Sequence, residues 1–291
     1  MARVNFFPLL PLALIACTTP KLAAETIGSL KSPATCSAVV LGDRVDCFPE
    51  GYQELNESNC NTRGCCWNQT VGDGDGIPIC FYPLQFGYAI SNVQQNSSGI
   101  EGDLHIFSPY QGPYGDNISP LKLRVSFLSE SILRFKIFDP NNARYEVPIQ
   151  VPQTDMYMEG ENPQYTVEIA QAPAAFGLRI RRASSQQPVF DSISFGGLVF
   201  EDQFIQLSTK LASAVGYGLG EHVAPLLLNY NWNTLSMFAR DQGTPSGYTN
   251  LYGVHPLLVT VEPSGNASGI FFFNSNAMDI VLQPTPGVTF R

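Results

Sequence analysis

Basic residues are scarce in this sequence of 291 residues, which has 16 Lys and Arg against 25 Asp and Glu and a formal net charge of −9. Proteins that bind nucleic acid neutralise phosphates with clustered Lys and Arg. No such cluster or basic stripe is present, so the charge argues against a nucleic-acid partner. With 44% hydrophobic residues and 14% charged residues, the chain has enough apolar material for a core.

Long apolar runs are also absent. The longest, Phe6–Cys17, follows Arg3 and precedes the small-residue stretch Leu22–Ala24, an arrangement that predicts a signal peptide over residues 1–24. This run is shorter than the ~20 residues that span a bilayer. We therefore expect no membrane span and a soluble mature protein. An alternative is a bacterial lipoprotein box that would acylate Cys17.

Cysteine is missing after Cys80. Apart from Cys17, the cysteines are Cys36, Cys47, Cys60, Cys65, Cys66 and Cys80. An even number at close spacing in a secreted chain predicts three disulfides, because so short a segment cannot hold itself together by apolar burial alone. Zinc is disfavoured, since this stretch contains no histidine and no paired C-x2-C motifs. We expect no metal and no cofactor. Counting leaves ~15 pairings open, and a bond between the adjacent Cys65 and Cys66 would be strained.

Asparagine sequons accompany the predicted signal peptide. Asn-x-Ser/Thr occurs at Asn56, Asn68, Asn96, Asn117 and Asn266. In a secreted chain each is a candidate glycosylation site on a surface loop, although some will be ordinary polar turns.

Sustained helical periodicity is absent, and the 22 prolines would interrupt helices repeatedly. "LKLRVSF" (121–127) and "ILRFKIF" (132–138) alternate apolar and polar residues, which predicts a hairpin that turns at "SES". "PSGNAS" (263–268) predicts a second hairpin turn. Further expected strands are 165–170, 176–182, 199–209, 256–262 and 269–275, and the aromatic run Phe271–Phe273 is expected in the core. Many short strands with Pro/Gly turns indicate a mainly β protein with a sandwich.

The cysteine-rich stretch carries a resemblance. "RVDCFPE" (44–50), "CNTRGCCW" (60–67) and "PICFYP" (78–83) resemble a trefoil, or P-type, domain over residues 36–83. The resemblance implies the pairs Cys36 to Cys66, Cys47 to Cys65 and Cys60 to Cys80. Some trefoils bind glycans, so Trp67 and Tyr52 are candidates to stack on a sugar. The favoured alternative is that Trp67 packs over the neighbouring disulfides.

A second resemblance covers the remainder. "YEVPIQVP" (145–152), "FEDQFIQLST" (200–209), "GLGEH" (218–222), "RDQGTPSGYTNLYGVHP" (240–256) and "FFFNSNAMDIVLQPTPGVTFR" (271–291) resemble the N-terminal sandwich of glycoside hydrolase family 31 α-glucosidases, most closely the lysosomal and then the intestinal members. This implies a β-sandwich of the galactose-mutarotase-like type over residues 84–291. The family's catalytic (β/α)8 barrel would follow and is absent here, which suggests a truncated chain.

The same resemblance indicates the site. Retaining glycosidases use two carboxylates about 5 Å apart, and the family's W-x-D-M-N-E nucleophile motif does not occur. "TDMYMEG" (154–160) lacks its flanking residues, so no catalytic residue is expected in this chain. By motif position, Asp241 is the substrate-binding aspartate that hydrogen-bonds sugar hydroxyls. A salt bridge to Arg240 or a turn cap is the alternative.

Three histidines complete the inventory of candidate groups. Glu221 and His222 in "GLGEH" suggest an acid/base pair, but the resemblance places them at the junction with the barrel. His105 and His255 have no cluster around them, so surface or strand-end roles are expected.

These features predict the N-terminal, carbohydrate-binding part of a retaining exo-α-glucosidase that acts on α-1,4-glucose oligomers or glycogen. Its partner would be an α-glucoside, bound with the missing barrel, and its location the secretory pathway, lysosomal or extracellular. The alternative is a non-catalytic secreted trefoil and sandwich module that binds carbohydrate or protein. A mutarotase-like epimerase rests on fold analogy alone.

Overall fold

The computed structural model describes residues 36–69, 76–96, 99–107, 110–150, 163–195, 197–244 and 247–291. The chain divides into two units, Met1–Leu30 and Lys31–Arg291, and every described residue belongs to the second. The predicted signal peptide, Cys17, "TDMYMEG" and the side chain of Tyr52 lie outside the described part. Within that part, no helix is long and apolar enough to cross a membrane.

The cysteine-rich segment forms short elements joined by disulfides. These elements are η1 (Leu41–Asp43), η2 (Tyr52–Glu54), α2 (Glu57–Thr62), β1 (Cys66–Trp67) and β2 (Cys80–Phe81). Asn56 caps α2 by accepting a hydrogen bond from the Asn59 N–H at 2.9 Å. The disulfides join Cys36 to Cys66, Cys47 to Cys65 and Cys60 to Cys80, the pairs that the trefoil resemblance implies.

A four-stranded antiparallel sheet follows in the order β3-β4-β5-β6. Its strands are β3 (Tyr88–Asn96), β4 (Gly99–Ile106), β5 (Leu121–Ser129) and β6 (Ile132–Phe138). In β5 the side chains of Leu121, Leu123 and Val125 are buried while the alternating Lys122 and Arg124 are exposed. The predicted alternation and the hairpin between β5 and β6 are therefore confirmed.

The largest sheet has eight strands in the order β13-β16-β17-β11-β9-β8-β7, with β10 paired to β11. Its strands are β7 (Tyr165–Ala170), β8 (Gly177–Arg182), β9 (Pro188–Asp191), β10 (Leu198–Phe200), β11 (Ile205–Lys210), β13 (Asn233–Met237), β16 (Met278–Gln283) and β17 (Gly287–Phe290). The expected single strand over 199–209 is wrong. It is two antiparallel strands, β10 and β11, because the chain turns between Glu201 and Phe204.

A third sheet has the order β12-β14-β15, with β12 (Gly216–Val223), β14 (Gly247–Val261) and β15 (Ala267–Phe271). The predicted turn at "PSGNAS" joins β14 to β15, and Gly265 there has φ 85°, which favours glycine. The expectation that Phe271–Phe273 lies in the core is wrong for Phe271, which is 59% exposed. Phe272 does pack, stacked on Phe290 at 4.8 Å.

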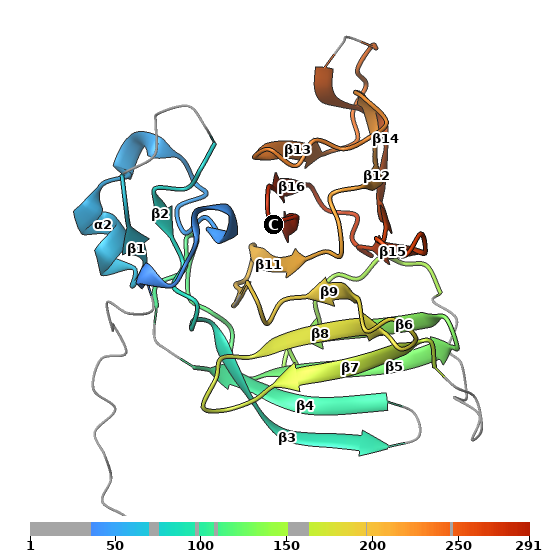
Figure 1. Cartoon of the computed structure of the whole chain (residues 1–291). Helices are drawn as coiled ribbons and strands as arrows, with labels where there is room; N and C mark the ends of the chain where they lie inside the picture. The colour runs from blue at the N-terminus through green and yellow to red at the C-terminus, as the bar shows by residue number, and fades with distance from the viewer. Residues whose placement is uncertain are drawn as a thin grey trace, which may run out of the picture. The chain divides into compact units, whose positions relative to one another are not determined.

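Figure 1 shows the arrangement of the three sheets. Two apolar cores lie against the large sheet. The first joins the four-stranded sheet to β7–β11, with Tyr88 and Leu104 on one side and Leu178 and Phe190 on the other. The second joins the three-stranded sheet to β13, β16 and β17. The mainly β fold is thus a sandwich in which one long sheet is covered by two shorter ones.

The trefoil shares its core with the sandwich. Tyr82 stacks on Phe86 with ring centroids 4.0 Å apart. Phe195 and Val199 of the sandwich belong to the same buried cluster as four trefoil cysteines, Cys47, Cys60, Cys65 and Cys80. Polar contacts add to this burial: Gln283 Nε2 donates to the Arg44 carbonyl at 2.8 Å, Lys210 Nζ lies 2.7 Å from Asp43 Oδ2, and Arg291 Nη1 lies 3.0 Å from Asp46 Oδ2. The trefoil is therefore part of one packed unit.

Candidate functional site

Asp241 lies in the connection between β13 and β14. The connection is held beside β14 by a hydrogen bond from the Arg240 N–H to the Leu251 carbonyl, 3.3 Å long. Both Arg240 and Asp241 are exposed. The loop therefore exposes a carboxylate to solvent on a backbone that is hydrogen-bonded to β14.

The alternatives to a ligand role for Asp241 were a salt bridge to Arg240 or a turn cap. Across the described ranges, no basic group lies within 4.0 Å of the Asp241 carboxylate and no hydrogen bond to it is formed. Neither alternative is seen there, so the carboxylate is available to a ligand. A carboxylate accepts hydrogen bonds from two adjacent hydroxyls, and such charge-assisted bonds are short and strong.

A groove of about 490 Å³ lies beside this connection. Its lining residues are Thr234, Ser236, Phe238, Arg240, Thr249 and Asn250. The sequence reasoning missed this groove, although the alternation of polar and apolar residues in "NTLSMF" predicts a two-faced strand. The groove walls come from β13 and β14, which no short motif could place side by side.

Glu221 and His222 are held by backbone bonds. Glu221 Oε2 accepts from the Gly253 N–H at 2.9 Å, and His222 Nδ1 lies 2.7 Å from the Leu219 carbonyl oxygen, so Nδ1 carries the proton. A Cβ at position 253 would lie 3.0 Å from both Glu221 and His255, which explains glycine there. These contacts favour a structural role over acid/base chemistry. His255 and His105 are exposed on β14 and β4.

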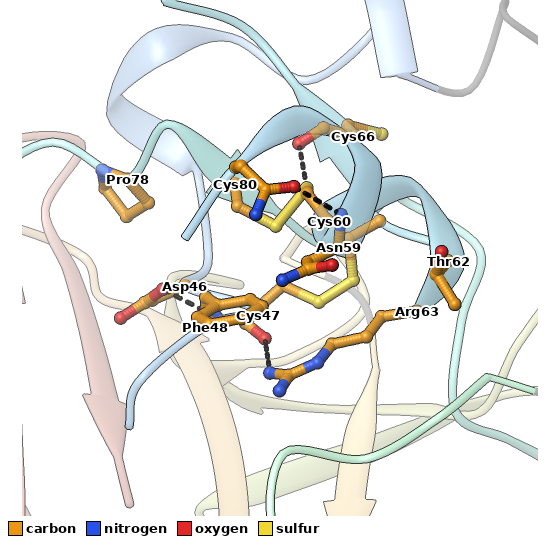
Figure 2. The surroundings of a disulfide bond; sticks show 12 residues. Asp46, Cys47, Phe48, Asn59, Cys60, Thr62, Arg63, Cys66, Pro78 and Cys80 are labelled. Carbon is orange, nitrogen blue, oxygen red and sulfur yellow. Dashed lines mark hydrogen bonds between the residues drawn. A yellow bond between two sulfur atoms is a disulfide. The ribbon is translucent and has the colours of Figure 1, made fainter. Parts of the chain in front are cut away.

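Figure 2 shows the interior of the trefoil, where the helix bearing Cys60 lies beside the Cys47 segment and the Arg63 side chain donates to the Cys47 carbonyl at 3.2 Å. The sulfur atoms of Cys47, Cys65 and Cys80 lie within 4.8 Å of one another. Each belongs to a disulfide, so none is a thiolate that can bind a metal. Trp67 is half-buried and packs against the buried cluster that contains these three cysteines, which agrees with the favoured alternative to sugar stacking.

A buried carboxyl at the trefoil junction escaped the sequence reasoning. Glu201 is 1% exposed, and its Oε2 accepts from the Tyr114 N–H at 3.0 Å. In the described structure its Oε1 has no hydrogen-bond partner. Burial raises the pKa of Glu201 to about 7. The sequence did not indicate this burial, because an acidic residue in "FEDQF" is typical of an exposed turn.

The sequons occupy different settings. Asn56, Asn96 and Asn266 are exposed, and Asn68 and Asn117 are half-buried. Asn117 Oδ1 accepts from the Tyr110 hydroxyl at 3.0 Å and from the Phe200 N–H at 3.3 Å. A glycan attaches to Nδ2 and so is compatible with these bonds, and glycosylation of each asparagine stays a prediction.

The comparisons with known proteins identify the class. Residues 36–83 match the trefoil (P-type) domain, and residues 122–280 match the N-terminal galactose mutarotase-like domain of glycosyl hydrolase 31. The second match covers more than half of the chain. This chain therefore belongs to glycosyl hydrolase family 31 and corresponds to its N-terminal part.

Its relatives include a sucrase-isomaltase and a lysosomal α-glucosidase. It is 41% identical over 258 residues to human intestinal sucrase-isomaltase, covering 86% of this chain and 14% of that protein. It is 38% identical over 272 residues to rat lysosomal α-glucosidase, covering 92% of this chain and 28% of that protein. The chain thus spans less than a third of these relatives.

Solved structures share the fold at low identity. A GH31 dextranase of Flavobacterium johnsoniae, in complex with isomaltotriose, matches with a TM-score of 0.52 and 16% identity, over 71% of this chain and 25% of that one. A DNJ-bound glucosidase II α subunit matches with a TM-score of 0.51 and 14% identity, over 71% of this chain and 31% of that one. At these identities the match shows the fold alone.

Proposed function

We propose that this chain is the N-terminal, carbohydrate-contacting part of a retaining exo-α-glucosidase that hydrolyses α-1,4-glucose oligomers or glycogen. The observation that carries this proposal is the carboxylate of Asp241, which is exposed and has no partner among the described residues, on a loop hydrogen-bonded to β14 in the family's N-terminal domain. The relatives named lysosomal α-glucosidase and sucrase-isomaltase support the hydrolysis of glucosides. The α-1,4 linkage and the exo mode rest on the family resemblance of the sequence.

In this proposal Asp241 binds sugar and does not perform the bond cleavage. Its carboxylate accepts hydrogen bonds from two hydroxyls of the terminal glucose and so fixes the orientation of that ring. Cleavage needs a nucleophile and a general acid/base about 5 Å apart. We assign both to the barrel that corresponds to the remaining length of the relatives. The 291-residue chain by itself is then inactive.

The proposed location is the secretory pathway, in the lysosome or outside the cell. Three disulfides persist in an oxidising compartment, which supports the secretory pathway. The lysosomal relative supports the lysosome as the location. The predicted signal peptide over residues 1–24 and the glycans at the sequons belong to the same proposal.

The test is a chimera in which residues 36–291 replace the matching segment of rat lysosomal α-glucosidase. We expect the chimera to release glucose from maltose at acidic pH and the 291-residue chain to release none. In the chimera, Asp241→Asn should lower kcat/KM by about 10- to 100-fold, because a hydrogen bond to a charged group contributes roughly 1.5–3 kcal/mol.

The matched control is Asp202→Asn, since the Asp202 side chain is 90% exposed and lies outside the β13–β14 connection. This variant should keep the kcat/KM of the chimera. Equal kcat/KM for the chimera and its Asp241→Asn variant would remove Asp241 from the site. Turnover by the 291-residue chain that is lost on Asp241→Ala would refute the assignment of catalysis to the barrel.

A further inference from the structure

The groove beside Asp241 is built on the outward face of β13. Successive side chains of a strand point to opposite faces. Leu235 and Met237 point into the second core and are 1% and 0% exposed. Thr234, Ser236 and the following Phe238 alternate with them and line the groove. The strand thus places two hydroxyls and one aromatic ring in a row.

The polar groups of this row can both donate and accept hydrogen bonds. Ser236 Oγ donates to Asp279 Oδ1 at 2.6 Å, which uses its hydrogen and leaves the oxygen able to accept. The hydroxyls of Thr234 and Thr249 have no hydrogen-bond partner within the ranges that the structure describes. Asn250 forms part of the wall and is itself fixed, because its Nδ2 donates to the carbonyls of Leu251 and Gly253 at 3.1 Å.

Phe238 is the apolar group of the groove. It is 55% exposed, although a benzyl side chain gains free energy from burial. The face of an aromatic ring carries negative charge density, which attracts the polarised C–H groups of a sugar ring. A hydroxyl-lined groove with one open aromatic face therefore suits a pyranose, which has hydroxyls around its edge and C–H groups on its face.

The charge of the groove favours a neutral ligand. Arg240 is the one charged residue among its lining residues, and Asp241 follows it directly in the chain. Anion sites rely on several donors around the same charge, such as bidentate guanidinium pairs. A guanidinium with a carboxylate one residue away does not make such a site, and the net charge of −9 opposes an anion further. A guanidinium does donate well to neutral hydroxyl oxygens.

We propose that the groove of β13 and β14 is a binding site for a second glucose unit of an α-glucan, with Phe238 stacking on the pyranose and Thr234, Ser236 and Thr249 contacting its hydroxyls. The proposal rests on the proposed function for the class of ligand. It goes beyond that function because it places glucan contact on sheet residues of this chain, outside the Asp241 loop.

The test measures glucan binding to the purified 291-residue chain by isothermal titration calorimetry and saturation-transfer NMR, with maltotetraose as the probe. We expect measurable binding that Phe238→Ala weakens by about ten-fold, since each ten-fold corresponds to ~1.4 kcal/mol and stacking contributes of that order. Thr249→Val keeps the side-chain volume and removes the hydroxyl, and it should weaken binding in the same direction.

Phe271→Ala is the matched control, because Phe271 is 59% exposed and is not part of the groove. It should leave binding unchanged. An equal loss of maltotetraose affinity in the two phenylalanine variants, or displacement of maltotetraose by inorganic phosphate, would overturn the proposed site.

The outcome is separable from that of the proposed function. If Phe238→Ala weakens the binding of maltotetraose and Asp241→Asn does not, the result supports the groove by itself. If both variants weaken binding, the result supports a continuous contact surface. A loss with Asp241→Asn alone, or no binding of maltotetraose by the chain, overturns the groove. The proposed function is judged independently by turnover of the chimera.

Discussion

The protonation of Glu201 gives a prediction whose size follows from the structure. The carboxyl is 1% exposed between the loop at Tyr114 and the turn that joins β10 to β11. A Cβ at position 112 would overlap Glu201 Oε1 and lie 2.9 Å from the Gly115 carbonyl oxygen, so the two oxygens face the same small space. A proton on Oε1 removes the charge from this buried oxygen, which has no hydrogen-bond partner among the described residues, and makes it a donor.

The sign of the effect follows from linkage. Burial raises the pKa of Glu201 from 4.5 to about 7, while Arg63 and the Tyr114 N–H act to lower the pKa and Glu50 and Asp116 act to raise it. Between these values the folded state holds a proton that the unfolded state has lost, so stability falls as pH rises. At 1.36 kcal/mol per pH unit the full effect is about 3 kcal/mol, absent below pH 4.5 and complete above pH 7.

Glu201→Gln tests this reasoning, because glutamine matches the neutral acid in shape and keeps both an acceptor and a donor. We expect wild type and variant to have similar free energies of unfolding at pH 4.5, and the variant to be more stable by about 2–3 kcal/mol at pH 8. Urea unfolding followed by circular dichroism across this range measures the difference. A difference that does not change with pH, or a variant that is less stable at pH 8, would refute the argument.

Two further predictions concern stability. Glu262→Gln should lower the free energy of unfolding by about 3–5 kcal/mol, because the Glu262 side chain is fully buried and accepts from two donors of Arg182 at 2.6–3.1 Å. The control Glu101→Gln, in an exposed pair with Arg124, should lower it by less than about 1 kcal/mol. Thermal unfolding distinguishes the two variants. The trefoil and the sandwich should unfold in one calorimetric transition because they share a core, and a separate trefoil transition would contradict that.

The local patterns in this sequence predicted local structure well. The alternation over 121–138 determines a hairpin because residues two apart must share one face of a strand. The glycine of "PSGNAS" determines a turn because its backbone adopts a positive φ at low cost. The cysteine spacing required disulfides, although their pairing came from the trefoil resemblance and not from the count.

Two features of the fold were beyond such patterns. "FEDQFIQLST" reads as one strand, but the hydrogen bond from the Glu201 N–H to the Phe204 carbonyl turns it into two. Phe271 looks like core in sequence, yet its strand lies at the edge of a sheet and leaves it exposed. The first case depends on a local turn that the apolar pattern of the segment conceals, and the second depends on which distant segments pack against β15.

The sequence by itself determined the disulfide module, the mainly β class, the family and the candidate role of Asp241, because composition, period-two alternation and motif wording are properties of neighbouring residues. Only the tertiary structure decided that the trefoil shares its core with the sandwich and that β13 and β14 line a groove with hydroxyls. It also decided that Glu201 is buried with no partner for Oε1 among the described residues. These features depend on which distant segments pack together, and burial and the environment of a charge are set by that packing.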